Sequence, residues 1–468
     1  MAAVVVEAAV AAAVRAAGVR PSRMNLDPYR NETPPRREVL PGGAVLLSVP
    51  MRTAHAVTLG VWLRTGSQDE PSGLDGVSHF LEHILFKGTM KRSALEVAET
   101  FDRMGAAVDA FTTKDMVAFT IKVLPEFFVE AVSLLGEMLF EPELDPKLVI
   151  LEQDVVCEEI QEALDTPEDR LHDAFAGRLY GSNARGRPIL GRPGVVRTFN
   201  PDLLRQQHRR LFAPANLVVS MAGNIMDGFH EVVAEIFARP DMTEPAGPGF
   251  VEDETTTPAA AFIDLALDEA DPFRLDMASP IIQTYFEIGN LGIPFHHEDR
   301  VPVFLLTNIL GGGMSSRIFQ AVREREGLAY TVYNYSDMGR DIGLVSCAGS
   351  CSPDKLERLE DVIRMEYYRL ISESMMVAEL DSNRAQIKSQ VIFSLEGMVN
   401  QMYRAARNEI LYGRFLPVSE LVDLVDVVSV DDIVRCAKSY FNPDSLLVAV
   451  LGPESFSPRS DPRPSVTP

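Results

Sequence analysis

The sequence predicts an α+β fold of two homologous domains, each a largely antiparallel or mixed sheet with helices packed against it. The chain has 468 residues, which is more than one ordinary core accommodates. Strand patterns and capped helical stretches follow one another along the first half. A helix, a turn and an apolar strand then close both halves in the same way, which indicates a repeated architecture.

Strand patterns open the first half. Residues 38–40, 44–49 and 55–63 are rich in apolar and β-branched side chains, and a proline–glycine–glycine turn separates the first two stretches. We therefore expect an antiparallel opening. A later apolar stretch, residues 107–123, is interrupted by the polar segment Thr112-Thr113-Lys114-Asp115, which predicts a hairpin.

Capping residues mark the helices that follow. Ser72 is expected to cap a helix that has Asp75 in its first turn and ends at residues 87–89. The segment Ser93-Ala94-Leu95-Glu96 has the capping-box pattern and opens a helix to about Met104. The other helical stretches expected in this part of the chain are residues 125–137 and 145–164.

Two segments of the chain have matching residues when one is shifted along the sequence by the interval between Phe212 and Phe441. Residues 202–223 and 431–452 both contain apolar helix positions, a turn with proline two residues after this phenylalanine, and an apolar strand that ends in glycine. We interpret this match as an internal duplication. A chance likeness between two helix–turn–strand units is the alternative.

These patterns divide the chain into two domains and a linker. Residues 240–280 are rich in Pro, Thr, Ala, Asp and Glu, as expected of a linker. The predicted boundaries are residues 1–37 for an N-terminal tail, 38–239 for the first domain, 240–280 for the linker, 281–455 for the second domain and 456–468 for a C-terminal tail.

Composition excludes several classes of protein. Asp and Glu number 67 against 44 Lys and Arg, a net charge of −23, and phosphate binding needs a basic surface, so we expect no nucleic-acid partner. No apolar run is long enough to span a membrane. The four cysteines are too few and too dispersed for a disulfide framework, so we expect free thiols and a reducing compartment.

The N-terminal segment bears on the compartment. Residues 1–23 lack the basic start and the continuous apolar centre of a secretory signal. We therefore expect a bacterial cytoplasmic location, or the mitochondrial matrix if this Ala-rich, Arg-bearing segment is a presequence. An extended start before Met24 is the other interpretation.

The segment His79-Phe80-Leu81-Glu82-His83 has the spacing of a metal site. On a helix, its two histidines lie one turn apart on the same face, where they can hold one metal ion, and Glu82 lies beside them. The order H-x-x-E-H reverses H-E-x-x-H, and both orders occur in zinc peptidases. The duplication places Asn308 and Gly312 at the histidine positions, so we expect no metal site in the second copy.

A catalytic zinc usually takes three protein ligands and leaves one position for water, so another ligand is needed. The helix expected from Asp145 carries Glu152 and Glu159, seven residues apart and therefore on one face. Glu159 would be the carboxylate ligand, and Glu152 an acceptor that orients an imidazole or helps with proton transfer. Two glutamates on a helix are otherwise typical of a solvated surface.

With these residues the chain resembles the inverted-motif zinc peptidases, the family of pitrilysin, insulin-degrading enzyme and the mitochondrial processing peptidase, and especially its short two-domain members. In that family the third ligand follows the second histidine at the same interval at which Glu159 follows His83. The resemblance covers residues 38–455 and implies that the two domains enclose a cavity with one Zn²⁺ held by His79, His83 and Glu159. Further matching segments are Gly66-Ser67, Phe86-Lys87-Gly88-Thr89, Gly186-Arg187-Pro188-Ile189-Leu190-Gly191 and Gly311-Gly312-Gly313-Met314-Ser315-Ser316-Arg317-Ile318-Phe319.

The resemblance also implies an arginine and a tyrosine that face the zinc from the second domain, and Arg323 and Tyr330 have the required spacing of seven. The implied reaction is metal-assisted amide hydrolysis, in which Glu82 takes a proton from water and delivers it to the leaving amine. Arg323 would hold a substrate carbonyl and Tyr330 would donate to the oxyanion. Without the resemblance, they would be interpreted as an exposed helix residue and a strand aromatic.

Peptides bound by this family lie as an added strand on a sheet edge near the metal. The matching segment makes Asp109, Ala110, Phe111 and Thr112 the candidates for substrate binding. Asp109 replaces the usual asparagine, which leaves main-chain pairing possible but puts the side-chain contact with substrate in doubt.

Two more acidic residues are candidates for substrate specificity. Asp169 and Asp173 lie one helical turn apart, ten and fourteen residues after Glu159. At these positions the processing peptidase places acidic groups that accept an arginine of the presequence. A solvated acidic helix face is the alternative.

The sequence thus predicts a zinc-dependent endopeptidase that acts on extended peptides or presequences. The alternative is a non-catalytic peptide-binding or structural subunit of the same family, although such subunits lose metal ligands. The resemblance further implies pairing with a second chain, as a homodimer or with a related subunit.

Overall fold

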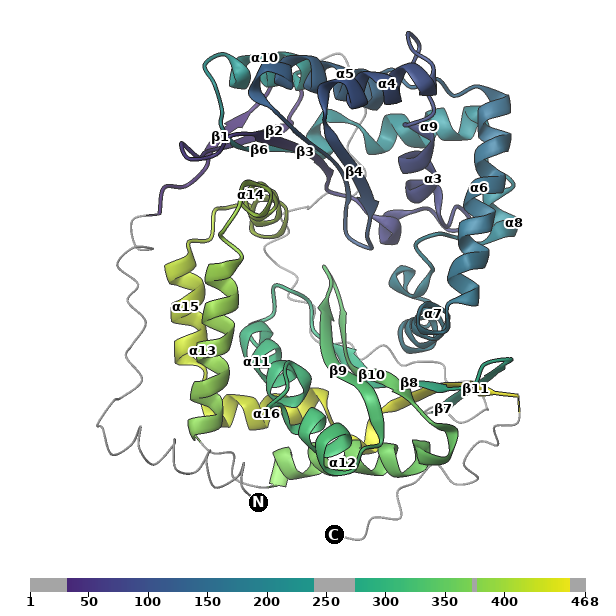
Figure 1. Ribbon diagram of the computed structural model, residues 1–468, viewed down its shortest axis with the longest axis vertical. Helices are drawn as coiled ribbons and strands as arrows, with labels where there is room; N and C mark the ends of the chain where they lie inside the picture. Colours follow the sequence, from purple (N-terminus) through teal and green to yellow (C-terminus); the bar gives the residue numbers. More distant parts are fainter. Residues whose placement is uncertain (1–31, 240–273, 373–376, 455–468) are drawn as a thin grey trace.

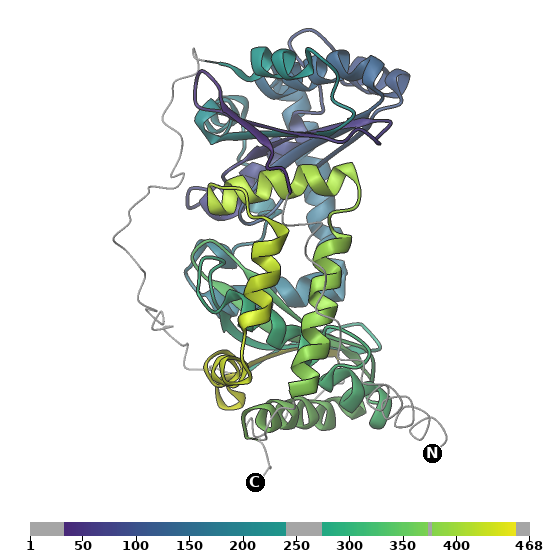
Figure 2. The same cartoon turned by 90° about the vertical axis from the view of Figure 1, so that its left-hand side faces the viewer.

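The computed structural model describes residues 32–239, 274–372 and 377–454. Two halves, each a sheet with helices, lie one above the other (Figure 1 and Figure 2). This arrangement confirms the predicted α+β class. The N-terminal segment 1–23, most of the predicted linker and the C-terminal tail lie outside the described residues.

The strands of the first half form a six-stranded sheet in the order β1-β2-β6-β3-β5-β4. β6 lies between β2 and β3, parallel to β2 and antiparallel to β3. The predicted antiparallel pairing is therefore correct for β1 with β2. It is wrong for β2 with β3, because β6, the last strand of this half, lies between them. The strands are β1 (Arg36–Val39), β2 (Val45–Pro50), β3 (Val57–Leu63), β4 (Ala107–Thr112), β5 (Val117–Val123) and β6 (Leu217–Gly223).

One face of this sheet carries the main core of the first half. Leu59, Val61 and Phe119 on the strands and Leu135 on a helix are almost completely buried there, and their burial is the main stabilising term for this layer. The helices that supply the core are α3 (Val77–Ile84), α4 (Ala94–Met104), α5 (Phe128–Phe140), α6 (Pro146–Asp165), α8 (Pro193–Val196), α9 (Pro201–Leu211) and α10 (Phe229–Phe237).

Most predicted helix ends are confirmed. Ser93 and Glu96 form a reciprocal capping box at the start of α4, and Gly105 ends it in the left-handed conformation at φ 59°. The prediction for Ser72 is wrong, because α3 begins one turn later with Gly76 as its N-cap, and the helix ends at Ile84 rather than at residues 87–89. The carboxylate of Glu70 takes the role expected of a capping side chain there.

The second half contains a five-stranded sheet in the order β7-β11-β8-β10-β9. The offset that relates Phe212 to Phe441 recurs in the elements, since it also relates the first residue of β2 to that of β7 and the first residue of α9 to that of α16. The elements of this half are β7 (Arg274–Ser279), β8 (Thr284–Gly292), α11 (Arg300–Gly311), β9 (Ala329–Met338), β10 (Gly343–Cys351), α12 (Leu356–Ser372), α13 (Val377–Phe393), α15 (Val418–Val427), α16 (Val430–Tyr440) and β11 (Leu447–Pro453).

Each half covers part of the other with a helix. α14 (Met398–Tyr412) lies across the face of the first sheet opposite its main core and contacts β2, β3 and β6 (Figure 2). α7 (Pro167–Tyr180) packs on β8 and β11 of the second sheet. The predicted domain boundaries stay a prediction, and the two halves share apolar cores across them.

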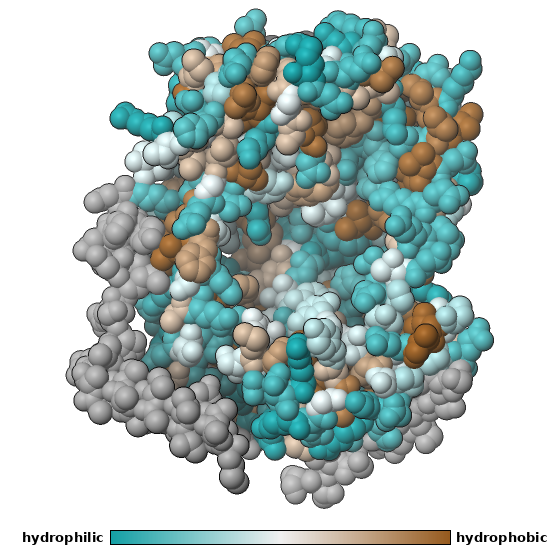
Figure 3. Space-filling view, viewed as in Figure 1, coloured by the Kyte–Doolittle hydropathy of each residue, from teal (hydrophilic) through white to brown (hydrophobic). Residues whose placement is uncertain are grey.

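Ion pairs also join the halves beside a recess that Figure 3 shows between them. Arg185, only 2% exposed, lies 2.7 Å from Asp337 of β9 and 3.1 Å from Asp115 of the β4–β5 hairpin. Arg340 reaches back to Asp69, with its Nη1 2.8 Å from the carboxylate. These contacts hold the β9–β10 hairpin against the β4–β5 turn and neighbouring loops of the first half.

Other expectations from composition agree with the structure. All four cysteines are free thiols. Among the described helices, none combines the length and apolarity needed to cross a membrane. The histidines outside the metal motif are exposed or hydrogen-bonded. His55 and His296 are exposed, His172 contacts Glu287, His208 the Leu139 carbonyl, His230 Ser48 and Glu38, and His297 the N–H of Asp299.

Candidate metal centre and substrate edge

The helix that carries the metal motif is anchored at its N-terminus. Gly76, at φ 91°, turns the chain into α3, and a Cβ there would lie 2.5 Å from the Leu190 carbonyl oxygen. The carboxylate of Glu70 accepts hydrogen bonds from the N–H groups of Gly76 and Ser78, each at 2.8 Å. These contacts fix the start of α3 and thereby the direction of His79 and His83.

The second helix of the centre is α6, which begins where Asp145 caps it and presents two glutamates to α3. Glu159 Oε2 lies 3.6 Å from His79 Nε2 and 3.4 Å from His83 Nε2. Glu152 Oε1 lies 2.9 Å from His83 Nδ1, so the two nitrogens of one imidazole face different glutamates. Helix packing therefore brings the predicted third ligand to the histidines.

The donor set fits a zinc ion. The ligand atoms of His79, His83 and Glu159 all lie within 4.8 Å of one another. Glu159 Oε2 is buried and has no hydrogen-bond partner, which is costly for a carboxylate oxygen unless a cation satisfies it. Two imidazoles and one carboxylate are a common catalytic zinc set with a position left for water.

Electrostatics differ between the two histidines. Burial, with a further contribution from His83, lowers the pKa of His79 to about 3, so its imidazole is neutral. The hydrogen bond to Glu152 raises the pKa of His83. Burial opposes ionisation of Glu152, but His83 and Lys87 outweigh it and hold the pKa of Glu152 below its ordinary value. Glu152 therefore stays charged and orients His83.

Glu82 lies between the metal group and the edge of the first sheet. Its side chain is buried, and burial raises its pKa. Thr112 of β4 donates a hydrogen bond from its Oγ1 to Glu82 Oε2 at 2.5 Å. A carboxylate with a raised pKa is suited to take up and release a proton near neutral pH.

The strand predicted to bind substrate is the edge strand of its sheet. β4 pairs with β5 on one side, and in the described part of the chain no strand pairs with its other side. Asp109, Ala110, Phe111 and Thr112 all lie on it. The open edge can accept a peptide as an added strand next to Glu82.

Comparison with known proteins identifies the family. Residues 45–192 match the insulinase family, peptidase family M16, and residues 198–387 match the peptidase M16 inactive domain. A Bacillus subtilis protein named as the uncharacterized zinc protease YmxG is 34% identical over 406 residues, which cover 87% of this chain and 95% of the relative. The chain belongs to peptidase family M16. An uncharacterized zinc protease of Streptomyces coelicolor is 31% identical over 418 residues, 89% of each chain.

Solved structures share the fold of this M16 chain. The Pseudomonas fluorescens structure described as a peptidase M16 inactive domain has a TM-score of 0.78 at 19% identity and covers 91% of this chain and 100% of its own. A protease from Helicobacter pylori has a TM-score of 0.77 at 21% identity, with 90% and 99% covered. The resemblance inferred from the motifs is thus confirmed at the level of family and fold.

Arg323 and Tyr330 form a pair on the second half. Arg323 lies on the π-helical turn Phe319–Arg325, and its guanidinium stands 4.4 Å from the centre of the Tyr330 ring. Its Nη1 also donates to the Tyr330 carbonyl oxygen at 3.2 Å. The Tyr330 side chain is 78% exposed. The structure therefore brings these two residues together, and their position relative to the metal group stays a prediction.

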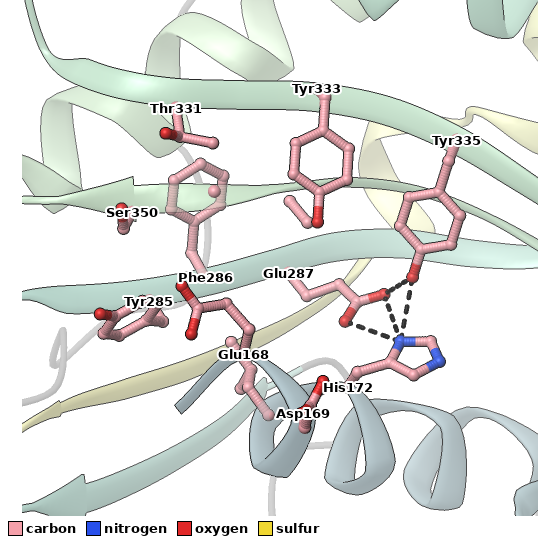
Figure 4. Close-up of a pocket in the computed structure, with 13 residues that line it drawn as sticks. Glu168, Asp169, His172, Tyr285, Phe286, Glu287, Thr331, Tyr333, Tyr335 and Ser350 are labelled. Atoms are coloured by element: carbon pink, nitrogen blue, oxygen red, sulfur yellow. Dashed lines mark hydrogen bonds and ion pairs between the residues drawn. The ribbon is translucent and has the colours of Figure 1, made fainter. Parts of the chain in front are cut away.

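The two acidic candidates on α7 have different surroundings. Asp169 lines a cavity of about 390 Å³ between α7 and the second sheet (Figure 4). Asp173 lies outside that lining, and burial raises its pKa although the nearby Lys114 opposes the shift. Of the two, Asp169 lines the cavity, and the role of both residues in substrate binding stays a prediction.

The cavity contains groups that the sequence analysis missed. Glu287, almost completely buried on β8, accepts hydrogen bonds from Tyr335 Oη at 2.5 Å and Ser346 Oγ at 3.0 Å, and His172 lies 3.3 Å away (Figure 4). Tyr333 points into the same space. The available signal was an acidic residue in the middle of an apolar strand, which is rarely left without a partner.

Proposed function

We propose that this M16 chain is a zinc-dependent endopeptidase that hydrolyses peptide bonds in extended peptides or presequence-like segments. The observation that carries the proposal is the position of Glu82. It lies on α3 between His79 and His83, and it accepts a hydrogen bond from Thr112 of the open-edged strand β4. A buried carboxylate, a group of three possible metal ligands and an open strand edge therefore lie next to one another.

The residues of the chain take distinct roles in this proposal. One bound Zn²⁺, held by His79, His83 and Glu159, would supply a Lewis acid and a water of lowered pKa. Glu82 takes a proton from the attacking water and delivers it to the leaving amine. Glu152 keeps the imidazole of His83 oriented through its Nδ1–H.

The substrate would be held by main chain and by the second half. The peptide pairs with β4 along residues 109–112, which places one of its bonds next to Glu82. Arg323 and Tyr330 contact the substrate carbonyl and the oxyanion from the second half. Asp169 accepts a basic side chain of the peptide in the cavity beside α7.

Metal analysis combined with a peptide assay tests the proposal. Zinc per chain and hydrolysis of a quenched fluorescent peptide are measured before chelation, after it and after zinc is returned. We expect about one zinc per chain and activity that follows the metal. Glu82→Gln should keep its zinc and lose at least about a hundredfold in turnover, the scale of one proton-transfer catalyst.

A matched control sits on the ligand helix. Glu158, exposed on α6 and adjacent to Glu159, offers the same substitution without a place in the centre, so Glu158→Gln should keep zinc and activity. Near-native turnover of Glu82→Gln would overturn its role as base. Zinc-loaded protein that binds peptides but cleaves none would favour a non-catalytic peptide-binding subunit.

The assembly and compartment stay predictions from the sequence. A homodimer, or a heterodimer with a related subunit, and a bacterial cytoplasmic location are consistent with this function. Size-exclusion chromatography with light scattering would measure the first of these.

A further inference from the structure

One aromatic residue of the second half lies against the candidate substrate strand. α14 runs below the first sheet in Figure 2. Its residue Tyr403 contacts Phe111 of β4. Its ring stacks on Phe111, with ring centres 5.9 Å apart and planes 12° apart. It also meets Trp62 edge-on, with ring centres 5.5 Å apart. Neither the metal centre nor the proposed chemistry uses this residue.

The stacked pair and the base lie on opposite faces of one strand. Successive side chains of β4 point to opposite faces, so Thr112 meets Glu82 while Phe111 turns toward α14. Val108 and Ala110 pack on the helix side with the main core, which agrees with this alternation. The stack is therefore the surface that β4 presents on the face turned away from Glu82.

An added peptide strand would share this alternation. Its residues next to β4 point by turns toward Glu82 and toward α14. Side chains directly across a strand pair have Cβ atoms about 4.5–5.5 Å apart, so one peptide side chain must lie beside Phe111. Phe111 and Tyr403 are both only partly buried, so their rings have surface left to cover.

We propose that Tyr403 is a specificity-determining residue that, together with Phe111, forms a subsite for an aromatic or large aliphatic side chain of the peptide. The inference rests on the proposed function, because it needs a peptide on β4. Since Tyr403 comes from the second half, selection of the side chain depends on contact between the halves.

The contacts of Tyr403 argue for a flat, pre-positioned wall. Trp62 is fully buried and holds one edge of the ring, and Thr120 hydrogen-bonds its hydroxyl. Thr120 pairs with Asp109 in the β4–β5 ladder, so the ring is tied to the same pair of strands that the peptide would extend. A rigid ring loses little freedom when a second apolar group covers it.

The chain contains its own probe for the test. Trp62 is the single tryptophan in the sequence and touches Tyr403, so its fluorescence reports on events at that ring. Zinc-loaded Glu82→Gln protein would be titrated with extended peptides that differ at one position, phenylalanine or serine, with that position moved along the peptide. Dissociation constants of the protein with Tyr403 in place are read from the Trp62 signal, and those of the Tyr403 variants are read by isothermal titration calorimetry, which does not depend on that contact.

The expected result is a preference at alternate positions. We expect phenylalanine to bind at least about threefold more tightly than serine at one register, and Tyr403→Ala to abolish that ratio. Tyr403→Phe keeps the ring and should keep the preference. Tyr412→Ala, on the same helix but packed near Phe295, is the matched control and should leave the ratio unchanged.

Other outcomes overturn the inference. An unchanged phenylalanine-to-serine ratio in Tyr403→Ala, or equal weakening of both peptides, means that Tyr403 only packs α14. If thermal unfolding shows that Tyr403→Ala is not folded, the Tyr403→Leu variant is used instead. Loss of the flat ring must then lower the preference for a peptide with phenylalanine over one with leucine. In the active protein, the same ratios are read from kcat/KM. Hydrolysis without a Tyr403-dependent ratio refutes only this inference, whereas selective binding without hydrolysis refutes only the proposed function.

Discussion

Replacing Glu152 with glutamine tests how the metal-binding helix is held. The side chain is 1% exposed, and its two oxygens serve different partners. Oε1 accepts from His83 Nδ1 at 2.9 Å, and Oε2 lies 2.8 Å from Lys87 Nζ. Glutamine has nearly the same size but no charge and only one acceptor oxygen, so one of these partners must lose its acceptor.

The loss of metal affinity can be bounded from these contacts. Removing the carboxylate behind a metal-bound imidazole typically costs 10- to 100-fold in affinity, about 1.4–2.7 kcal/mol. Lys87 is 35% exposed and can turn to water, so we expect the amide oxygen to stay with His83 and the loss to lie near the lower bound. If the amide nitrogen faces Nδ1 instead, the loss moves toward the upper bound.

The assay is a competition titration against a chromophoric chelator, with thermal unfolding of the same samples. We expect the zinc dissociation constant of Glu152→Gln to rise about 10- to 100-fold while that of Glu158→Gln stays at the native value. A well-folded Glu152→Gln variant whose dissociation constant is within twofold of the native one would refute the idea that Glu152 orients His83.

Three further predictions concern other parts of the chain. Asp169→Asn should lower the preference for arginine over leucine before the scissile bond by about threefold or more, measured as a ratio of kcat/KM values. If the native protein has no such preference, the proposed acidic subsite is wrong. Gly339→Ala should lower the free energy of unfolding by about 1–3 kcal/mol in chemical unfolding, because the new Cβ would lie 2.2 Å from Arg185 Nη1. Gly194 has open space around it, so Gly194→Ala should leave the free energy of unfolding unchanged. Burial lowers the pKa of Lys114 to about 8 from an ordinary 10.5, so between these pH values the unfolded chain binds more protons than the folded one. The free energy of unfolding should therefore rise with pH in this range, by at most about 1.4 kcal/mol per pH unit, and Lys114→Met should remove this contribution.

The parts of the site that could be predicted from residue patterns are those set by local periodicity. His79, Glu82 and His83 lie within about one helical turn, and Glu152 and Glu159 lie two turns apart on one face, so spacing alone predicts which side chains point together. That these two helices pack against each other came from the family resemblance. Spacing cannot supply it, because contact between elements far apart in sequence depends on the whole core.

Predictions failed where a distant or unexpected group replaced the local one. Ser72 is a good capping residue, yet Glu70 caps α3 because the loop that contains Leu190 packs on Gly76 and shifts the helix start. Asp169 and Asp173 share a helix face, Asp169 lines the cavity between α7 and the second sheet, and the role of both residues in substrate binding stays a prediction. Glu287 was not predicted because its partners come from α7, β9 and β10.

By itself, the sequence determined the family and the α+β class and predicted the zinc donors, since the motifs that carry the family resemblance are local in the chain. Only the tertiary structure decided that β6 separates β2 from β3, that the β4 edge is left open beside Glu82, and that Tyr403 of α14 lies on the first sheet. The physical reason is that helix and strand periodicity are written within a few residues, whereas the partner that buries each apolar face is chosen by packing over the whole chain.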